Sequence, residues 1–91
     1  MPSFRLTVRT PAGIACDETV DHVRAPGLDG SFGVLAKHAP MIAVLKAGML
    51  QIRHDQKRQS LLVGDGILEI RDDAMTVLTS SAERQDEDLP H

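Results

Sequence analysis

The residues of this chain best suited to chemistry are its four histidines and its single cysteine. His22, His38, His54 and His91 stand at least 16 residues apart, and Cys16 has no second cysteine to accompany it. Zinc sites usually show their ligands in short, paired spacings. The sequence therefore predicts no metal site, and only the fold could bring distant histidines together.

Cys16 is equally unsuited to nucleophilic catalysis. Asp17 and Glu18 follow it directly. Their negative charges raise the pKa of a thiol, whereas a reactive cysteine needs a lowered pKa. We expect Cys16 to be a small residue packed in the interior.

Two further patterns are similar to cofactor sites. Residues 27–33 are rich in glycine, but they lack the lysine and hydroxyl pair that complete a phosphate-binding loop. Lys46, followed by Ala47 and Gly48, is similar to the modified lysine of a biotin or lipoyl carrier. We expect Lys46 simply to end a strand before a glycine turn, and we keep the carrier as the alternative function.

The elements that must position these residues are short β-strands. Residues 4–9 and 50–53 alternate apolar and polar side chains, which is typical of a half-buried strand. Hairpins are predicted around the acidic turn at residues 71–74 and around the polar loop at residues 54–59. A less regular strand is expected over residues 19–24, with a bulge between its two valines. The pattern predicts an all-β sandwich or barrel.

Composition narrows the possible classes of function. A chain of 91 residues forms one domain, and with only two aromatic residues its core must be aliphatic. A net charge of -3 and the shortage of aromatic residues argue against nucleic acid as a partner. No apolar run reaches the roughly 18–20 residues that span a bilayer, so we expect no direct membrane insertion.

The end of the chain differs from the rest. We expect residues 1–80 to form the β-domain and residues 81–91 a short polar tail. Ser81 could cap a turn or two of helix over residues 82–89. Isolated helices this short are marginal in water, so we expect the tail to be frayed.

The least polar segment contains the most specific pattern. It is Gly30-Ser-Phe-Gly-Val-Leu-Ala-Lys-His-Ala-Pro40, followed closely by Leu45-Lys-Ala-Gly-Met49. This pattern resembles the central signature of the ε subunit of F-type ATP synthases. Residues 66–69 and 75–78 also match in order and spacing, so the resemblance covers roughly residues 4–84.

The resemblance implies a fold and a mechanical function. It implies a flattened β-sandwich of about ten short strands, without catalytic residues or a cofactor. Such a domain would be a rotor part of the central stalk, coupling the γ subunit to the membrane-embedded c ring. Its place would be peripheral, on the cytoplasmic face of the bacterial inner membrane.

The resemblance also implies two sets of contact residues. The γ-contact set comprises His38, Ala39, Pro40, Met41 and Ile42, and the c-ring set comprises Asp29, Gly30, Ser31 and Phe32. Ser31 stands where many relatives have an acidic residue, so a charged contact to the c ring would be weaker or would use Asp29.

The backbone of this segment has its own signals. Gly30 and Gly33 allow sharp turns, and Pro40 biases Ala39 away from helix. Residues 41–45 are apolar on both sides of any strand, so we assign their exposed part to γ; the alternative is a strand buried on both faces.

Two other expectations concern activity. Most members of the resembled family continue into a two-helix domain that restrains ATP hydrolysis and in some cases binds ATP. Because this sequence stops at His91, we expect neither property. An enzymatic alternative would pair His38 with a nearby carboxylate such as Asp29.

Overall fold

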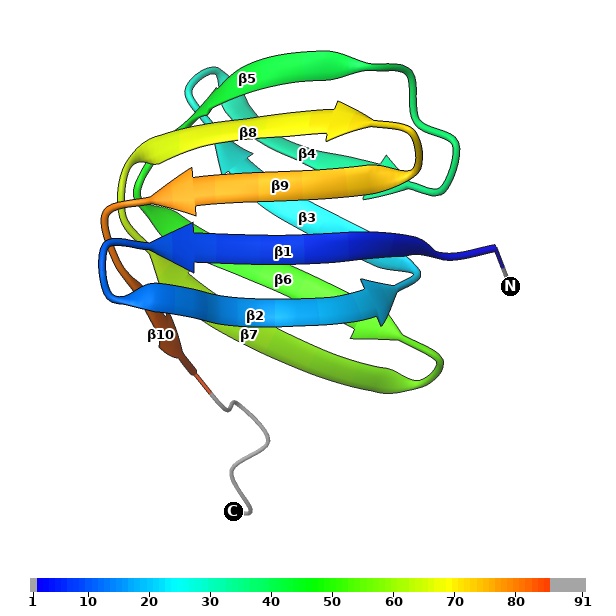
Figure 1. Cartoon of the computed structure of the whole chain (residues 1–91), viewed down its shortest axis with the longest axis horizontal. Coiled ribbons are helices and arrows are strands. Elements are labelled where there is room, and N and C mark those ends of the chain that lie inside the picture. Colours follow the sequence, from blue (N-terminus) through cyan, green and yellow to red (C-terminus); the bar gives the residue numbers. More distant parts are fainter. Residues whose placement is uncertain (1, 86–91) are drawn as a thin grey trace.

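The computed structural model describes residues 2–85, which form only strands, turns and bends (Figure 1). No helix occurs in this range, so none is long and apolar enough to cross a membrane. The all-β prediction is confirmed. The ten strands of these residues are β1 Phe4–Thr10, β2 Gly13–Val20, β3 His22–Gly27, β4 Gly30–Leu35, β5 Met41–Leu45, β6 Gly48–His54, β7 Lys57–Val63, β8 Gly66–Arg71, β9 Ala74–Thr79 and β10 Ala82–Arg84.

The strands belong to one continuous sheet that folds over on itself into a flattened sandwich. Its order is β10-β7-β6-β3-β5-β8-β9-β1-β2, and β4 pairs with β3 outside this path. In Figure 1, β5, β8, β9, β1 and β2 form the front layer, while β4, β3, β6 and β7 lie behind them. The described ladders are antiparallel except for β1 with β9, which is parallel.

The core lies between the two layers and is aliphatic, as the composition predicted. Alternate residues of each strand point inward because successive side chains leave opposite faces of a sheet. Phe32 packs against this core while remaining partly exposed. The buried hydrophobic residues are Phe4, Leu6, Val8, Cys16, Val20, Val23, Ala25, Val34, Leu45, Leu50, Ile52, Leu61, Val63, Leu68, Ile70, Met75 and Val77.

Both predicted hairpins are confirmed. The β8–β9 turn consists of Asp72 and Asp73, whose φ angles are 53° and 57°. Positive φ at both central residues matches the right-handed twist of the flanking strands. In the β6–β7 turn Asp55 has a φ of 57°. Aspartate tolerates this conformation better than most residues because its short side chain bonds locally to the backbone.

Two local predictions are wrong. Residues 19–24 do not form one bulged strand, because β2 ends at Val20 and β3 begins at His22. Val20 and Val23 are both buried because each points inward from its own strand. At the other end, Ala82–Arg84 is not helical but pairs with Leu61, Leu62 and Val63 of β7. The frayed tail was expected over residues 81–91, of which residues 86–91 lie outside the described range.

Candidate protein interface

Residues 30–40 of the signature, together with β5, fold onto one edge of the sandwich (Figure 1). Strand β4 pairs only with β3. Strand β5 pairs with β8 along its whole length, but it meets β3 only where Gly27 faces Leu45. Among the described strands, β4 therefore has one side without a strand neighbour, and β5 has one such side over most of its length. We call β4, the connector of residues 36–40 and β5 the open edge.

A hollow of about 460 Å³ lies between the two strands of the open edge. It brings all four residues of the predicted c-ring set together with Met41 and Ile42 of the predicted γ-contact set. His38, Ala39 and Pro40 do not line it, because they belong to the connector. The lining comprises Gly27, Leu28, Asp29, Gly30, Ser31, Phe32, Met41, Ile42, Ala43 and Val44.

Strand β5 has one buried and one exposed face. Leu45 is almost fully buried, whereas the side chains of Ile42 and Val44 are 72% and 51% exposed. Met41 and Ala43 are partly buried and pack against the core. The alternative of a strand buried on both faces is therefore wrong for this domain.

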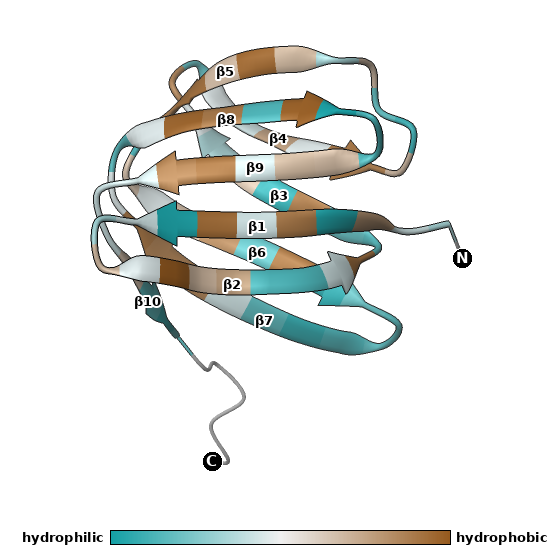
Figure 2. Ribbon diagram, viewed as in Figure 1, coloured by the Kyte–Doolittle hydropathy of each residue, from teal (hydrophilic) through white to brown (hydrophobic). Residues whose placement is uncertain are grey.

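The exposed face continues across neighbouring strands as an apolar row of Leu28, Val44, Ile67 and Leu78. The backbone N–H of Leu28 donates to the carbonyl of Val44 at 3.2 Å. Val44 faces Ile67 across the β5–β8 ladder, and Ile67 faces Leu78 across the β8–β9 ladder. All four side chains are roughly half exposed or more. Figure 2 shows the corresponding hydrophobic stretches along β5, β8 and β9. Large contiguous apolar surfaces are characteristic of interaction sites on soluble proteins.

Sequence reasoning missed three members of this row, although a signal was present. Leu68 and Val77 each have an apolar neighbour, Ile67 and Leu78 respectively. Because successive side chains point to opposite faces, one member of each apolar pair must face outward. Leu28 had no such signal, since only the β3–β4 turn brings it beside Val44.

The connector is held by hydrogen bonds. Lys37 adopts a φ of 63°, and its N–H donates to a carboxylate oxygen of Asp73 at 2.7 Å. Nδ1 of His38 lies 2.8 Å from the carbonyl oxygen of Ala39. His38 forms no ion pair with any carboxylate of residues 2–85. The enzymatic pairing of His38 with Asp29 therefore has no geometric support.

The two glycines of the signature have different roles. Gly30 has a φ of 122°, which agrees with the expected sharp turn. Gly33 lies inside β4 and has no such conformation, so the turn expected there is wrong. A Cβ at Gly33 would lie only 3.0 Å from Nε2 of His22. Gly33 instead makes room for the imidazole of His22.

This architecture corresponds to a known domain. The family model described as "ATP synthase, Delta/Epsilon chain, beta-sandwich domain" matches residues 3–85. The chain belongs to this family. The epsilon chain of Desulforamulus reducens is 37% identical over 83 residues, covering 91% of this chain and 63% of that protein. The epsilon chain of Pelotomaculum thermopropionicum is 40% identical over 83 residues, covering 91% and 62%. The chain thus spans somewhat less than two thirds of these epsilon chains.

Chains in two solved ATP synthase structures have the same fold. A chain in the Euglena gracilis mitochondrial ATP synthase, OSCP/F1/c-ring, superposes with a TM-score of 0.86 and 21% identity, covering 92% of this chain and 54% of that one. A chain in the central stalk/c-ring structure of the Tetrahymena thermophila mitochondrial enzyme gives 0.73 and 19%, covering 86% and 63%. At these identities the comparison supports the fold alone.

Cys16 and Lys46 are the two other residues that the sequence offers for chemistry. Cys16 is buried, and burial, with the charge of Glu18, raises the pKa of its thiol to about 12. This burial agrees with the expectation that Cys16 is a small residue packed in the interior. Lys46 is exposed between β5 and β6, and its N–H donates to the carbonyl of Pro26 at 2.7 Å. The family match leaves the carrier alternative without support.

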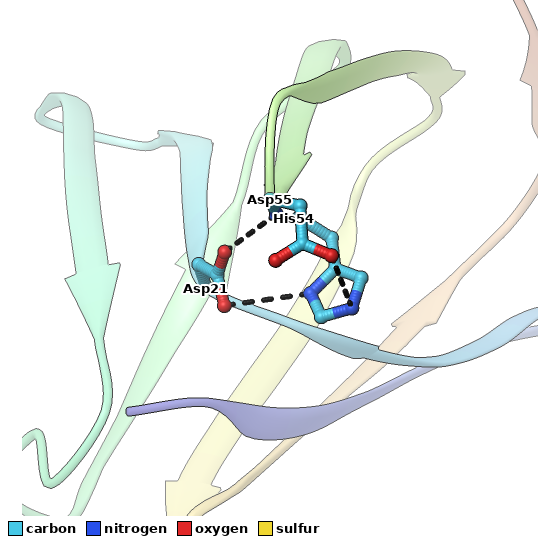
Figure 3. A group of neighbouring side chains, drawn as sticks. All are labelled: Asp21, His54 and Asp55. Carbon is cyan, nitrogen blue, oxygen red and sulfur yellow. Dashed lines mark hydrogen bonds and ion pairs between the residues drawn. The ribbon is translucent and has the colours of Figure 1, made fainter. Parts of the chain in front are cut away.

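One cluster of metal-ligand types does form where the sequence predicted none (Figure 3). Asp21, His54 and Asp55 bring one ligand atom each within 4.8 Å of the others. Asp21 lies 3.4 Å from Nδ1 of His54, whereas Asp55 lies 3.7 Å from Nε2 on the other side of the ring. The two contacts are therefore made to different nitrogens of the ring.

The cluster does fasten the β6–β7 hairpin to the start of β3. The N–H of Asp55 donates to a carboxylate oxygen of Asp21 at 2.6 Å. This hydrogen bond, together with the neighbouring His54, lowers the pKa of the Asp21 carboxyl below its usual value. One signal for this role was present in the sequence, since an aspartate between two buried valine-containing strands needs local hydrogen-bond donors.

Proposed function

We propose that this domain is a non-catalytic part of the ATP synthase central stalk that couples the γ subunit to the c ring. The observation that supports the proposal is the open edge, where two strands that each have one largely unpaired side lie beside the apolar row. The related proteins are named epsilon chains, and one structural neighbour belongs to a central stalk/c-ring structure. The proposed location is peripheral, at the cytoplasmic face of a bacterial inner membrane.

The shape of the open edge suits two partners at once. The β3–β4 turn, with Asp29, and the connector, with His38 to Pro40, lie at opposite ends of the edge (Figure 1). In our proposal γ covers His38, Ala39, Pro40, Met41 and Ile42 and extends over the apolar row. The c ring meets Asp29, Gly30, Ser31 and Phe32 at the other end. A short, stiff sandwich between two contacts can transmit torque without any chemistry of its own.

Mutation of the apolar row tests the γ contact. Val44→Asp places a charge in the proposed interface, and burying an unpaired charge is strongly unfavourable. We expect at least tenfold less γ subunit to co-purify with the tagged chain expressed in a complete ATP synthase. Leu62→Asp is the matched control, because Leu62 is 43% exposed on β7, away from the open edge. Equal recovery of γ with both variants would contradict the proposed contact, provided both melt cooperatively.

The c-ring contact has its own test. Asp29 and Ser31 are both exposed, and Asp29 forms no ion pair within residues 2–85, so its charge is available to a cationic loop. Asp29→Asn should weaken c-ring recovery most at low salt, where charge attraction is least screened. Glu83→Gln removes an equally exposed carboxylate from β10 and should have no effect. If c-ring recovery depends on salt in the Asp29→Asn variant as strongly as it does in the original chain, the result would argue against this contact.

The proposal assigns residues 2–85 no part in blocking ATP hydrolysis, since this range contains no helix that could enter the catalytic head. Adding the 91-residue chain to an enzyme purified without it should therefore restore assembly and leave the hydrolysis rate unblocked. Strong inhibition by this chain that persists when residues 86–91 are removed would contradict that assignment.

A further inference from the structure

Three arginines converge on the outer face of the rear layer. Arg24 comes from β3, Arg53 from β6 and Arg58 from β7, and together they border a hollow of about 270 Å³. The rest of its lining is His22, Gln51 and Ile52. We call this site the basic hollow.

The strand register forces the positive charges together. Arg53 stands directly opposite Arg58 in the β6–β7 ladder and opposite His22 in the β3–β6 ladder. Like charges directly opposite one another on a sheet are destabilising. Arg5 and Arg71 elsewhere in the domain form ion pairs, but Arg24, Arg53 and Arg58 form none with the residues that the structure describes. No ion pair within residues 2–85 therefore offsets their repulsion.

The nearest carboxylates do not neutralise the basic hollow. Asp21 and Asp55 border an adjoining hollow that shares Arg53 and Arg58 and also includes Lys57. Asp21 is already engaged by the N–H of Asp55 and by His54. Asp55 faces Nε2 of His54 and adds no ion pair to either arginine. The local excess of positive charge remains.

His22 adds an imidazole whose protonation responds to an anion. Its ring lies against the backbone of Gly33, where a side chain would crowd it. Burial first, and then the charges of Arg53 and Arg24, lower the pKa of His22. A bound anion opposes the arginine charges and would raise this pKa, so His22 can report on occupancy.

We propose that the basic hollow binds a phosphate-class oxyanion between Arg24, Arg53 and Arg58. Guanidinium groups present paired N–H donors that match the oxygens of phosphate. The Gln51 amide supplies a further neutral donor. The volume suits one or two phosphate groups and is below the usual 300–1,000 Å³ or so of pockets for larger organic ligands. The site does not depend on the open edge or on the proposed stalk function.

The test follows the His22 imidazole signals by NMR as inorganic phosphate or pyrophosphate is added to the full chain. We expect a saturable shift with pyrophosphate and a higher pKa of His22, with no such response to sodium chloride at matched ionic strength. Arg53→Gln and Arg58→Gln should each weaken binding at least tenfold. Arg9→Gln, which removes an exposed arginine of β1 in the front layer, should change it less than twofold.

A second arm identifies the source of the phosphate group. Vesicles of phosphatidylglycerol are compared with vesicles of phosphatidylcholine in a sedimentation assay. Sedimentation with phosphatidylglycerol alone, lost in Arg53→Gln, would identify a lipid headgroup; saturable pyrophosphate binding without sedimentation would identify a free anion. The proposal is overturned if neither probe binds, if sodium chloride reproduces the shift, or if a variant lacking both Arg53 and Arg58 binds as well as the original chain.

Discussion

The backbone N–H of Lys37 donates a hydrogen bond to a carboxylate oxygen of Asp73 at 2.7 Å, which joins the connector of the open edge to the β8–β9 turn. Lys37 has a φ of 63°, a conformation that costs a non-glycine residue roughly 1–2 kcal/mol. The position of the proposed γ-contact residues therefore depends on an aspartate in a different hairpin.

Removing the Asp73 carboxylate should loosen the connector. Asp73→Gly keeps the positive φ of the turn but deletes the acceptor, at a cost of about 1–3 kcal/mol in local stability. We expect the Lys37 amide to exchange with deuterium at least tenfold faster, measured by NMR. Asp72→Gly is the control, because Asp72 shares the positive φ and no hydrogen bond joins it to the connector. Unchanged exchange in Asp73→Gly would show that the connector is held by other contacts.

The close approach of His22 to Gly33 should appear as coupling between the two positions. In a chain carrying His22→Ala, Gly33→Ala should stabilise the strand by about 0.5–1 kcal/mol, because alanine loses less entropy on folding than glycine. With His22 present, most of that gain should disappear, since the new Cβ would lie 3.0 Å from Nε2. Urea unfolding of the four chains measures the coupling, and additive effects would contradict the proposed steric role.

The lowered pKa of Asp21 predicts a loss of stability in acid. An aspartate in an unfolded chain titrates near about 3.9. Because the folded value is lower, the Asp21 contribution is present above that pH and disappears as the pH falls through the folded pKa. Asp21→Asn should therefore be less stable than the original chain at pH 6 and approach it in strong acid. Asp17, whose pKa is lowered by Arg5, is present in both the original chain and the Asp21→Asn variant, so its titration does not contribute to the difference between them. A difference independent of pH would rule out the charge as its cause.

Two leucines of one hairpin should differ sharply in their importance for stability. Leu68 is 1% exposed and faces Val77 in the core, whereas Leu78 is 45% exposed in the apolar row. Leu68→Ala should cost about 2–5 kcal/mol, since it removes contacts and leaves a cavity. Leu78→Ala should cost within about 0.5 kcal/mol. Urea unfolding of both variants checks this, and similar losses would mean that Leu78 is part of the core in solution.

The fold was largely predictable because its signals are local. Alternation in residues 4–9 and the aspartates at positions 72 and 73 act through neighbouring residues, and both predictions are confirmed. The sequence predictions were wrong where pairing between strands distant in the sequence determines the local structure. Ala82–Arg84 has an acceptable sequence for a helical turn, yet the free side of β7 offers its backbone strand partners. Asp21 separates two strands that a pattern of spaced valines had joined.

The candidate sites were less predictable than the fold. The signature gave the residues of the open edge, but it could not show that β4 and β5 would both lack neighbours there. The overall negative charge of the chain gave no sign of the basic hollow. Its arginines are distant in sequence and come together only through the register of β3, β6 and β7. The same holds for the cluster of Asp21, His54 and Asp55, whose members are brought together by the hairpin.

The parallel pairing of β1 with β9 has a consequence for biosynthesis. Arg5 finds its partner only at Ala74, so β1 has no β9 to pair with until most of the chain has been made. At about 5–20 residues per second, a ribosome needs roughly 3–14 s to synthesise the intervening segment. Until then β1 can form only its hairpin with β2, and the inward side chains of this pair stay uncovered. The front layer can therefore close only after β9 has been synthesised.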